Sequence, residues 1–318
     1  MYAARRMRII IPDDYQDAVR HLDCFAKLVG HEVTIFNDTV KDVDALAERF
    51  RDADALVLIR ERTQITDALL DKLPRLKVIS QTGKGAAHID LDACARRGVE
   101  VLVGTGSPIA PAELTWALVM AAMRFIPQEV ASLRTGHWQS MLGRVLHGRT
   151  LGIWGYGKIG SRVAGYGRAF GMTVLVWGRE GSLSRAHADG FTTVDDKTAL
   201  FERSDVLSLH LRLTKETRGV VTSSDLARMK PDALLVNTSR AELIESGALE
   251  CALLAGRPGF AAVDVYEQEP VLGADHPLLA MPNVVCTPHL GYVEKDSYEL
   301  YLGQAFDNLL QWSVSGSP

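Results

Sequence analysis

Short runs of apolar, often β-branched residues alternate along the chain with longer stretches in which apolar residues recur at helical spacing. Each run is apolar almost throughout rather than at every second position, which is typical of strands in a parallel sheet covered by helices on both faces. The pattern therefore predicts an α/β protein with two doubly wound parallel sheets. The expected strands are 7–12, 32–36, 55–59, 77–81 and 99–103 for the first sheet, and 151–155, 173–177, 206–210, 233–237, 260–265 and 283–288 for the second.

The boundary between the two expected domains falls in the segment SPIAPAELTWALVMAAMRF. Pro108 and Pro111 mark a loop, and Pro111 stands where a helix can begin. Residues 112–125 are apolar around most of a helical circumference, which predicts a helix buried between the domains. A last helix, 294–312, follows the final strand and is expected to pack on the first domain. The expected domains are 1–112 with 293–318, and 113–292.

Composition and charge narrow the class of protein. The 318 residues are enough for two domains, and hydrophobic and charged fractions of 47% and 23% are those of ordinary globular chains. The net charge of −4, with both signs mixed, gives no reason to expect a nucleic acid or an anionic membrane as partner. The longest apolar run, 114–123, is shorter than the ~20 residues of a bilayer span.

The N-terminal stretch MYAARRMRIIIPDD carries charge but has no apolar run before its acidic turn, so we do not expect a signal peptide. The four cysteines are widely spaced and form no CxxC pair. We expect them to be buried, reduced thiols rather than disulfides or metal ligands, and the protein to be cytoplasmic. These cysteines are Cys24, Cys94, Cys251 and Cys286.

A glycine-rich turn follows the first expected strand of the second domain. Gly155, Gly157 and Gly160 give the spacing G-x-G-x-x-G between the strand 151–155 and a helical stretch, 158–171. In a dinucleotide site the first glycine permits a tight turn and the second lets the backbone approach a pyrophosphate. The third allows close packing of the helix, whose N-terminus faces the phosphates. Such glycines also serve ordinary tight turns, but the order strand, turn, helix, strand favours a dinucleotide site.

The residues after the next strand decide which dinucleotide fits. An NAD site commonly has an acidic residue there to bind both ribose hydroxyls. After Trp177 this chain has Gly178 and then Arg179, so a 2′-phosphate meets no carboxylate and has a cation to pair with. We therefore favour NADP(H) over NAD(H). Two alternatives stay open: Arg179 is an exposed loop charge, or Glu180 takes the ribose if the loop is shifted by one residue.

Three segments of the second domain place chemically active residues at the carboxyl ends of expected strands, where an open α/β sheet binds its ligands. Arg240 follows the strand in ALLVNTSR, Asp264 and Glu269 lie in AAVDVYEQEP, and His289 follows the last strand in NVVCTPHLG. Each has an ordinary structural explanation by itself, as a helix-start charge, a loop acid or a turn histidine. Together they indicate a shared site.

The set suits hydride transfer to a 2-keto acid. Arg240 offers a permanent, bidentate partner for a substrate carboxylate. The carbonyl oxygen needs a proton as hydride arrives, and a histidine is a common proton donor at neutral pH, so His289 is the candidate acid. A carboxylate beside that ring, here Glu269, favours its charged form and fixes its orientation.

These motifs in this order resemble the D-2-hydroxyacid dehydrogenase family, which includes phosphoglycerate dehydrogenase and glyoxylate/hydroxypyruvate reductases. The resemblance covers nearly the whole chain and rests on GRTLGIWGYGKIG, SDVLSLHLRLTKETRG, LLVNTSRAELIESGAL, AAVDVYEQEP and TPHLG. It implies a flavodoxin-like substrate domain, a Rossmann dinucleotide-binding domain, and NAD(P)-dependent conversion of small D-2-hydroxy acids and 2-keto acids.

The resemblance also implies roles for single residues. Arg240, Glu269 and His289 match the family's substrate-binding, histidine-pairing and acid/base positions, and Asp264 the acid near the nicotinamide carboxamide. The segment GKGAAHID resembles the loop whose backbone amides hold the substrate carboxylate. The expected substrate contacts are Arg60, Lys84, Gly85, Arg240 and His289. The expected cofactor contacts are Gly155, Tyr156, Gly157, Lys158, Ile159, Gly160, Gly178, Arg179, His210, Arg212, Thr238 and Asp264.

The chain departs from the family pattern in places. Arg212 stands where proline is common, in a loop beside the cofactor, as a second phosphate partner or an exposed charge. The segment VGTGSPIAPAE is shorter than the family's usual loop beside the substrate, so the particular 2-keto acid stays open. The segment GHWQSMLGRVLHG resembles the family's dimer-contact arm and predicts a homodimer.

Two other classes of protein compete with this interpretation. Some relatives of this fold are NAD(H)-sensing corepressors, which can keep the same three residues. A phosphoryl-accepting receiver domain is suggested by Asp13 and Asp14 after the first strand. That mechanism also needs an aspartate after the third strand, where this chain has Arg60, so the acidic pair is expected to act in a turn or a helix cap.

Overall fold

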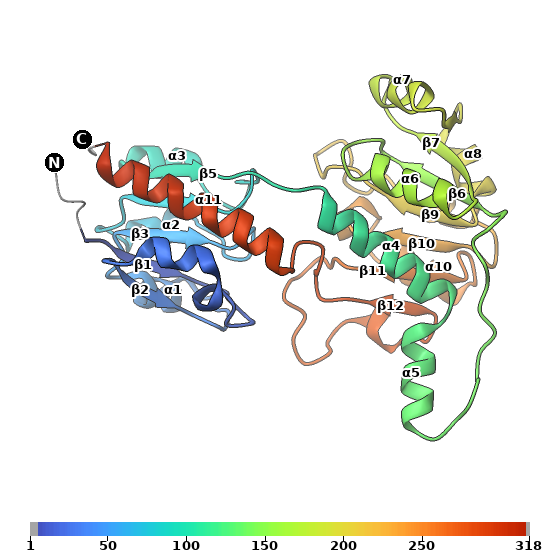
Figure 1. The fold of residues 1–318 in the computed structure, drawn as a ribbon, viewed down its shortest axis with the longest axis horizontal. Coiled ribbons are helices and arrows are strands. Elements are labelled where there is room, and N and C mark those ends of the chain that lie inside the picture. Colours follow the sequence, from blue (N-terminus) through green and yellow to red (C-terminus); the bar gives the residue numbers. More distant parts are fainter. Residues whose placement is uncertain (1–5, 316–318) are drawn as a thin grey trace. The chain divides into compact units, whose positions relative to one another are not determined.

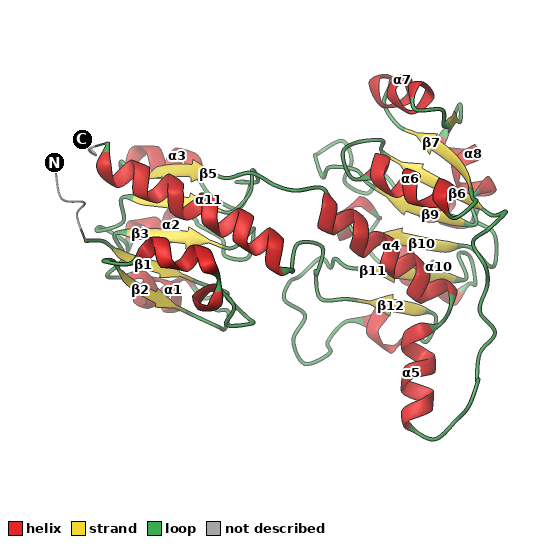
Figure 2. Ribbon diagram, viewed as in Figure 1, coloured by secondary structure: helices red, strands yellow, loops and turns green. Residues whose placement is uncertain are grey.

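The computed structural model describes residues 6–315 and divides the chain into two compact units (Figures 1 and 2). Unit 1 comprises Met1–Ser107 and Val293–Pro318, and unit 2 comprises Pro108–Tyr292. Residues 108–112, which we expected in the first domain, therefore belong to unit 2. The first five residues of the N-terminal stretch MYAARRMRIIIPDD, for which no signal peptide is expected, lie outside the described part of the chain.

Unit 1 is built on a five-stranded sheet in the order β2-β1-β3-β4-β5, with every neighbouring pair parallel. Its strands lie where the apolar runs predicted them. They are β1 (Arg8–Ile11), β2 (Glu32–Ile35), β3 (Ala55–Leu58), β4 (Val78–Gln81) and β5 (Glu100–Val103). The helices are η1 (Val19–His21), η2 (Asp23–Leu28), α1 (Val43–Phe50), α2 (Asp67–Asp71), α3 (Leu91–Arg96) and α11 (Lys295–Val314).

Helices cover both faces of this sheet. The helices α1, α2 and α3 pack against one another on one face, while α11 and η2 lie together on the other (Figure 1). The C-terminal helix thus returns to the first unit, as the sequence predicted, and Ser80 on β4 donates a hydrogen bond of 2.8 Å to the carbonyl of Ala305. Side chains of Asp42, Thr66 and Asp90 cap α1, α2 and α3 by accepting backbone N–H groups, which explains where each helix begins.

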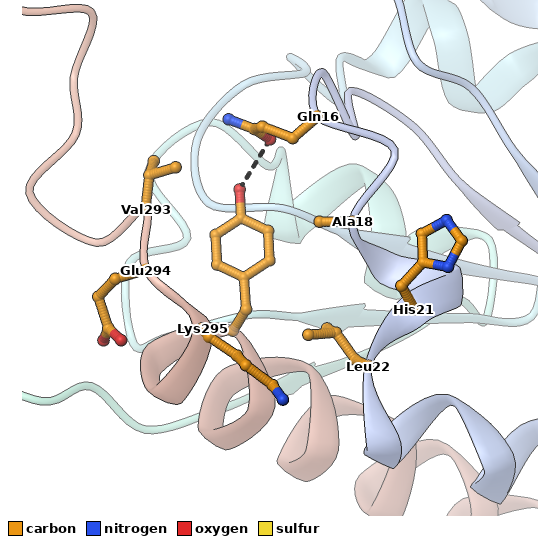
Figure 3. Close-up of a pocket in the computed structure, with 8 residues that line it drawn as sticks. Gln16, Ala18, His21, Leu22, Val293, Glu294 and Lys295 are labelled. Carbon is orange, nitrogen blue, oxygen red and sulfur yellow. Dashed lines mark hydrogen bonds between the residues drawn. The ribbon is translucent and has the colours of Figure 1, made fainter.

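Unit 1 also contains a cavity of about 380 Å³ between the start of α11 and the segment that precedes η2. The Tyr298 hydroxyl donates a hydrogen bond of 3.3 Å to Oε1 of Gln16, and both residues line this cavity, which Figure 3 shows from close by. The residues that line it are Gln16, Ala18, His21, Leu22, Val293, Glu294, Lys295 and Tyr298, and the predicted substrate contacts of unit 1 are not among them.

Unit 2 has a seven-stranded parallel sheet in the order β12-β11-β10-β9-β6-β7-β8. Six strands match the predicted runs, and β8, two threonines long, was not expected. The strands are β6 (Thr150–Trp154), β7 (Thr173–Trp177), β8 (Thr192–Thr193), β9 (Val206–Leu209), β10 (Leu234–Asn237), β11 (Phe260–Val263) and β12 (Val284–Cys286). The helices are α4 (Ile109–Met123), α5 (Ile126–Arg134), α6 (Gly160–Ala169), α7 (Glu180–Ala188), α8 (Lys197–Arg203), α9 (Ser223–Leu226), α10 (Ala248–Leu254), η3 (Ala241–Leu243) and η4 (Pro277–Ala280).

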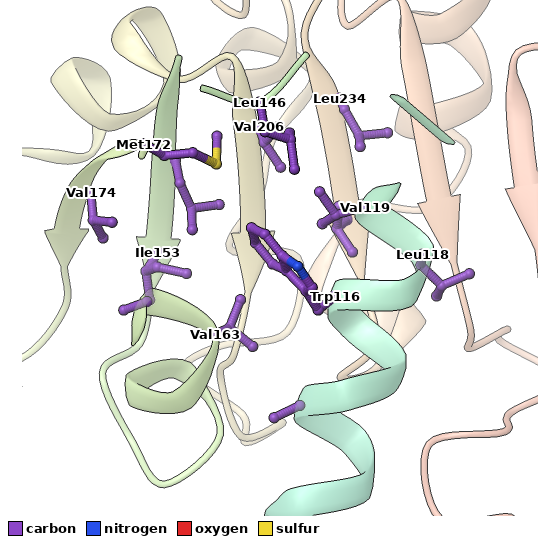
Figure 4. Packing of buried hydrophobic residues seen from close by; sticks show 14 of the residues in the cluster. Trp116, Leu118, Val119, Leu146, Ile153, Val163, Met172, Val174, Val206 and Leu234 are labelled. Atoms are coloured by element: carbon purple, nitrogen blue, oxygen red, sulfur yellow. The ribbon is translucent and has the colours of Figure 1, made fainter. Parts of the chain in front are cut away.

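The apolar helix α4 forms much of the core on one face of this sheet. It packs against α6 and against β10, β11 and β12, and Trp116 lies among the aliphatic side chains of the sheet (Figure 4). The helix begins at Ile109, three residues before the predicted start, and Pro111 lies within its first turn. That position tolerates proline because the first four N–H groups of a helix have no partner within it.

The opposite face is covered by α8, α9 and α10, whose apolar side chains form a second core with β7, β9, β10 and β11. The cysteine prediction is partly wrong. All four cysteines are free, and Cys24 and Cys94 are buried, but Cys251 is exposed on α10 and Cys286 is half-buried at the end of β12. An apolar run that ends a strand or faces outward on a short helix does not guarantee burial of its cysteine.

The described residues contain neither a single helix that could cross a membrane nor a cluster of side chains that could bind a metal ion. No single helix within residues 6–315 is long and apolar enough to cross a membrane, and α4 and α5 reach that length and composition only when taken together across a 58° bend. No cluster of three or more His, Cys, Asp or Glu side chains with the geometry of a metal site occurs in the described part of the chain.

Candidate active site

The candidate site lies at the carboxyl edge of the sheet of unit 2. Strand β6 has β7 on one side and β9 on the other, so the order of strands reverses at β6. Loops that leave the carboxyl ends of β6 and β9 diverge there, and such a switch point is where open α/β sheets bind ligands. The glycine-rich turn follows β6 directly, between Trp154 and the first residue of α6, Gly160.

The three glycines of the turn meet three different surroundings. Gly155 has a φ of +101°, and a Cβ there would lie 2.7 Å from the carbonyl oxygen of His210. A Cβ on Gly160 would lie 2.2 Å from the carbonyl oxygen of Gly155, so the start of α6 packs directly on the turn. A Cβ on Gly157 would meet no described atom within 4 Å. The open space beside the Gly157 backbone leaves room for the approach of a pyrophosphate, and the contact itself stays a prediction.

The side chains of the turn point in different directions. Tyr156 is buried, and its hydroxyl donates a hydrogen bond of 2.7 Å to Oδ2 of Asp189. The Tyr156 side chain therefore points away from a ligand at the turn, and the cofactor contact expected of Tyr156 stays a prediction for its backbone. Lys158 is exposed, and Ile159 is half-buried at the N-terminal end of α6.

The end of β7 lies against the turn. The N–H of Gly155 donates a hydrogen bond of 2.9 Å to the carbonyl of Trp177, and a Cβ on Gly178 would make only ordinary contacts, the nearest 3.6 Å away. Arg179 and Glu180 are both exposed where α7 begins. The structure thus leaves room beside the turn and places a cation within two residues of Trp177.

Two further groups share the surroundings of Arg179. Arg185 on α7 donates hydrogen bonds to the carbonyl of Tyr156 at 3.1 Å and to Oγ of Ser182 at 3.3 Å, so a second guanidinium lies at the turn. The pKa of Glu216 lies below its usual range, mainly because Thr214 donates a hydrogen bond to it, and the charge of Arg179 adds to the effect. The loop that contains exposed Arg212 therefore comes close to Arg179.

His210 and Thr238 follow β9 and β10 at the same edge. Burial lowers the pKa of His210 to about 4, so the ring is neutral at pH 7, and Nε2 lies 3.0 Å from Oγ of Ser208. The hydroxyl of Thr238 shares a hydrogen bond of 2.7 Å with that of Thr115 on α4. Both residues lie at the edge of the sheet that carries the glycine-rich turn. The contacts expected between these residues and a cofactor stay predictions.

Glu269 and His289 are in direct contact, as the sequence predicted. Nδ1 of His289 lies 2.6 Å from Oε2 of Glu269, and Oε1 of the same carboxylate accepts the N–H of Tyr266 at 3.0 Å. Burial opposes ionisation of Glu269, but its hydrogen bond to His289 and the nearby positive charges hold its pKa below the usual range. The carboxylate is therefore ionised at neutral pH. About a quarter of the His289 side chain, 27%, is exposed, which leaves the ring accessible.

The loop that carries His289 is held by Asp264, the residue that follows β11. The Asp264 side chain is fully buried, and its two oxygens accept hydrogen bonds from the Thr287 hydroxyl at 2.6 Å, from the N–H of Leu290 at 2.7 Å and from the N–H of Gly291 at 2.9 Å. Burial raises the pKa of Asp264. These bonds flank His289 on both sides, so the contacts seen for Asp264 position the histidine. The cofactor contact expected of Asp264 stays a prediction.

Arg240 lies near the pair. It follows β10, where the side-chain amide of Asn237 donates a hydrogen bond of 2.8 Å to its carbonyl, and its own charge is among those that lower the pKa of Glu269. One cation, one carboxylate and one imidazole from the ends of β10, β11 and β12 are thus brought to one edge of the sheet.

The other predicted substrate contacts belong to unit 1. Arg60 lies in the turn after β3, and Lys84 and Gly85 lie in the loop after the neighbouring strand β4. The receiver-domain alternative is not supported in the same unit. Asp14 caps η1 by accepting the N–H groups of Ala18 and Val19, at 3.1 and 2.9 Å, as a structural acid would.

Two features of the site escaped the sequence analysis. Arg185 lies in the second turn of α7 as an ordinary helical arginine, and only the folded structure shows that it contacts the carbonyl of Tyr156. The bonds from Asp264 to the His289 loop join positions more than twenty residues apart. In the sequence, the one indication of these bonds was an aspartate directly after an apolar strand, because a carboxylate in such a buried position needs hydrogen-bond partners.

Comparison with known proteins gives consistent matches. The model of the family described as D-isomer specific 2-hydroxyacid dehydrogenase, NAD binding domain, matches residues 116–291, which lie within unit 2. A D-3-phosphoglycerate dehydrogenase of Methanocaldococcus jannaschii is 38% identical over 289 residues, 90% of this chain but 53% of the relative. The chain thus spans about half the length of that relative. A glyoxylate reductase of Aeropyrum pernix is 38% identical over 288 residues, 86% of this chain and 84% of its own length.

Two solved structures are similar over nearly the whole chain. A phosphoglycerate oxidoreductase from Vibrio cholerae is 56% identical and superposes with a TM-score of 0.95, covering 98% of this chain and 100% of the other. An oxidoreductase from Ralstonia solanacearum is 61% identical, also with a TM-score of 0.95, over 97% of this chain and 95% of its own.

The glycine turn gives a first prediction. Gly157→Ala should leave the free energy of unfolding nearly unchanged, because its Cβ enters open space, yet weaken NADPH or NADH binding about tenfold or more by filling the place of the pyrophosphate. Gly160→Ala is the matched control and should destabilise the fold, since its Cβ meets the Gly155 carbonyl. Urea unfolding and cofactor fluorescence titration measure the two effects. Unchanged cofactor affinity in Gly157→Ala would contradict the assignment.

Proposed function

The chain belongs to the D-2-hydroxyacid dehydrogenase family, and we propose that it transfers a hydride between a nicotinamide cofactor and a small D-2-hydroxy acid or 2-keto acid. The observation that carries the proposal is the 2.6 Å contact between His289 and Glu269 on the same sheet edge as the glycine turn. A titratable ring with an ionised partner is the group that such a reaction needs for its proton.

In the proposed reduction, the nicotinamide supplies the hydride to the carbonyl carbon when it is bound. His289 donates its Nε2 proton to the carbonyl oxygen and becomes neutral, and in the oxidative direction it takes that proton back. Glu269 accepts the hydrogen bond from Nδ1, which leaves Nε2 for the substrate and stabilises the charged ring. Asp264 fixes the loop so that the ring keeps this orientation.

Arg240 is proposed to bind the substrate carboxylate and to polarise the carbonyl. A guanidinium offers two parallel donors to a carboxylate, and its charge favours the oxygen on which negative charge develops. Arg60, Lys84 and Gly85 of unit 1 are proposed as further substrate contacts, with unit 1 as the substrate domain and unit 2 as the dinucleotide-binding domain. The relatives reported above are named as dehydrogenases, reductases or oxidoreductases, and they give no support to a corepressor role.

We further propose NADP(H) as the preferred cofactor. The absence of a carboxylate at Gly178 and the neighbouring guanidinium of Arg179 support the choice, and Arg185 adds a second cation at the turn. Glu216 acts against it, because a carboxylate close to Arg179 competes with a phosphate for the same charge. The remaining cofactor contacts, including Lys158, His210, Arg212 and Thr238, are proposed on the same basis.

A homodimer, located in the cytoplasm, completes the proposal. Large apolar side chains are exposed along the segment after α5, where Trp138 is 77% and Leu142 92% exposed. Glu129 on α5 accepts the N–H groups of Ser140 and Met141 and so holds this segment in place. An ordered, exposed apolar surface is typical of a protein interface, and a second copy of the chain is the proposed occupant.

The acid/base role is tested by His289→Ala. Turnover with a 2-keto acid should fall by about 10²–10⁴-fold, the usual contribution of a general acid, while cofactor affinity stays the same. His276→Ala is the matched control, because His276 also pairs with a glutamate, Glu267, at 3.3 Å. It should change turnover little. Equal turnover in His289→Ala and the parent protein would remove His289 from the mechanism.

The cofactor preference is tested by Arg179→Ala. Loss of a charge-assisted bond to the 2′-phosphate should raise the KM for NADPH about tenfold or more and leave that for NADH within about twofold. Arg203→Ala, which removes an exposed arginine at the end of α8, should affect neither. Steady-state kinetics with both cofactors provide the measurement, and equal effects on the two KM values would exclude a contact with the phosphate.

The homodimer is tested by Leu142→Arg. A charge at the most exposed apolar side chain of the segment should convert the dimer to a monomer in sedimentation velocity at micromolar concentration. Leu254→Arg, at a leucine that is 79% exposed on α10, should leave the dimer intact. A monomeric parent protein, or an intact dimer with Leu142→Arg, would contradict the proposal.

A further inference from the structure

The loop that carries His289 begins with a tight turn at Thr287. The N–H of His289 donates a hydrogen bond of 3.0 Å to the carbonyl of Thr287, two residues earlier in the chain. A bond of this span closes a three-residue turn, here around Pro288. His289 itself has a φ of 52°, in the left-handed region that non-glycine residues seldom adopt. The direction of the imidazole therefore depends on where the Thr287 carbonyl is held.

A second donor holds the same carbonyl. The hydroxyl of Tyr266 donates a hydrogen bond of 3.0 Å to it, so Tyr266 and His289 share one acceptor. Tyr266 lies in the loop after β11, and Thr287 directly follows β12, the parallel neighbour of β11. The hydrogen bond therefore joins the two loops that supply Glu269 and His289.

Tyr266 also holds the partner of the histidine. Its backbone N–H donates a hydrogen bond of 3.0 Å to Oε1 of Glu269, whose other oxygen lies 2.6 Å from Nδ1 of His289. One residue thus contacts the carboxylate through its backbone and the histidine turn through its side chain. Asp264 has a different place, because its oxygens bind the Thr287 hydroxyl and the N–H groups that follow His289.

The phenol that makes this bond is firmly placed. Tyr266 is 8% exposed, and it belongs to the core that α8, α9 and α10 cover. A tyrosine has only two side-chain torsions, so a ring packed in a core leaves its hydroxyl little freedom to move. Burial also raises the pKa of Tyr266, so the hydroxyl keeps its proton and remains a donor at neutral pH.

We propose that Tyr266 is a positioning residue of the hydride-transfer reaction, which keeps the ring of His289 aligned with Glu269 and with the substrate carbonyl. The inference rests on the proposed function, in which His289 donates the proton. Tyr266 acts through His289 and contacts neither substrate nor cofactor itself. Because a proton donor must lie within hydrogen-bond reach of its acceptor, a small displacement of the ring slows the reaction more than it weakens binding.

Tyr266→Phe tests the proposal, because it removes the hydroxyl but keeps the ring and the N–H that binds Glu269. The Thr287 carbonyl keeps the N–H of His289 as donor, so the variant should remain folded, which urea unfolding checks. With hydroxypyruvate, kcat should fall about three- to tenfold, while the KM values for keto acid and cofactor stay within about twofold. Tyr298→Phe is the matched control. It removes another buried hydroxyl, which donates to Gln16 in unit 1, and should leave kcat unchanged.

A second experiment asks whether the effect passes through the histidine. In a protein that already carries His289→Ala, adding Tyr266→Phe should leave the residual turnover within about twofold, because no ring remains to be positioned. A residue with a merely structural role, or one that contacted the substrate itself, would lower turnover by the same factor with and without His289. Single-turnover mixing, with protein in excess over NADPH, measures the slow residual reaction.

These results separate the inference from the proposed function. Suppose that the parent protein reduces hydroxypyruvate. If Tyr266→Phe then leaves kcat unchanged, raises only KM, or lowers turnover equally in the His289→Ala protein, the positioning role of Tyr266 is wrong and the proposed function stands. If the parent protein binds the cofactor but reduces no 2-keto acid, both fall.

Discussion

Every strand pair described in both sheets is parallel, and this constraint brings together residues that are far apart in the chain. Parallel strands end at one edge of a sheet, so the turns after β6, β7, β9, β10, β11 and β12 all open on the same side of unit 2. The glycine turn, the guanidinium of Arg179 and the Glu269–His289 pair therefore lie at one edge of the sheet. In unit 1 the same constraint places Arg60 and Glu61 on the loop that follows β4.

Parallel pairing alone does not fix the orientation of a catalytic side chain. In unit 2 the buried carboxylate of Asp264 fixes the loop that carries His289. Asp264 accepts three hydrogen bonds from the segment 287–291, and His289 lies between the donors with a left-handed φ of 52°. Leaving such buried donors unpaired costs about 1–3 kcal/mol each, so the loop has little freedom to relax. One acidic residue thus positions the ring, while a second, Glu269, holds its charge.

Much of the fold could be predicted because a buried parallel strand needs an apolar side chain at nearly every position. The strand β8 escaped because two threonines give no such run, and α4 begins earlier than expected because its first turn tolerates Pro111. The glycine turn and the Glu269–His289 contact also followed from residue types and spacing. The buried side chain of Tyr156 and the contact of Glu61 with Gly85 did not, because they depend on tertiary packing that no local pattern encodes.

The central claim is that this edge of the sheet supports hydride transfer to a 2-keto acid, and its most direct test follows the absorbance of the reduced nicotinamide. Purified protein would receive NADPH or NADH together with glyoxylate, hydroxypyruvate or a bulkier 2-keto acid. The account predicts loss of that absorbance only when a 2-keto acid is present, with glycolate as the product from glyoxylate and a 2-hydroxy acid of D configuration as the product from the other acids. No loss with any of these acids, while fluorescence shows that the cofactor binds, would contradict it.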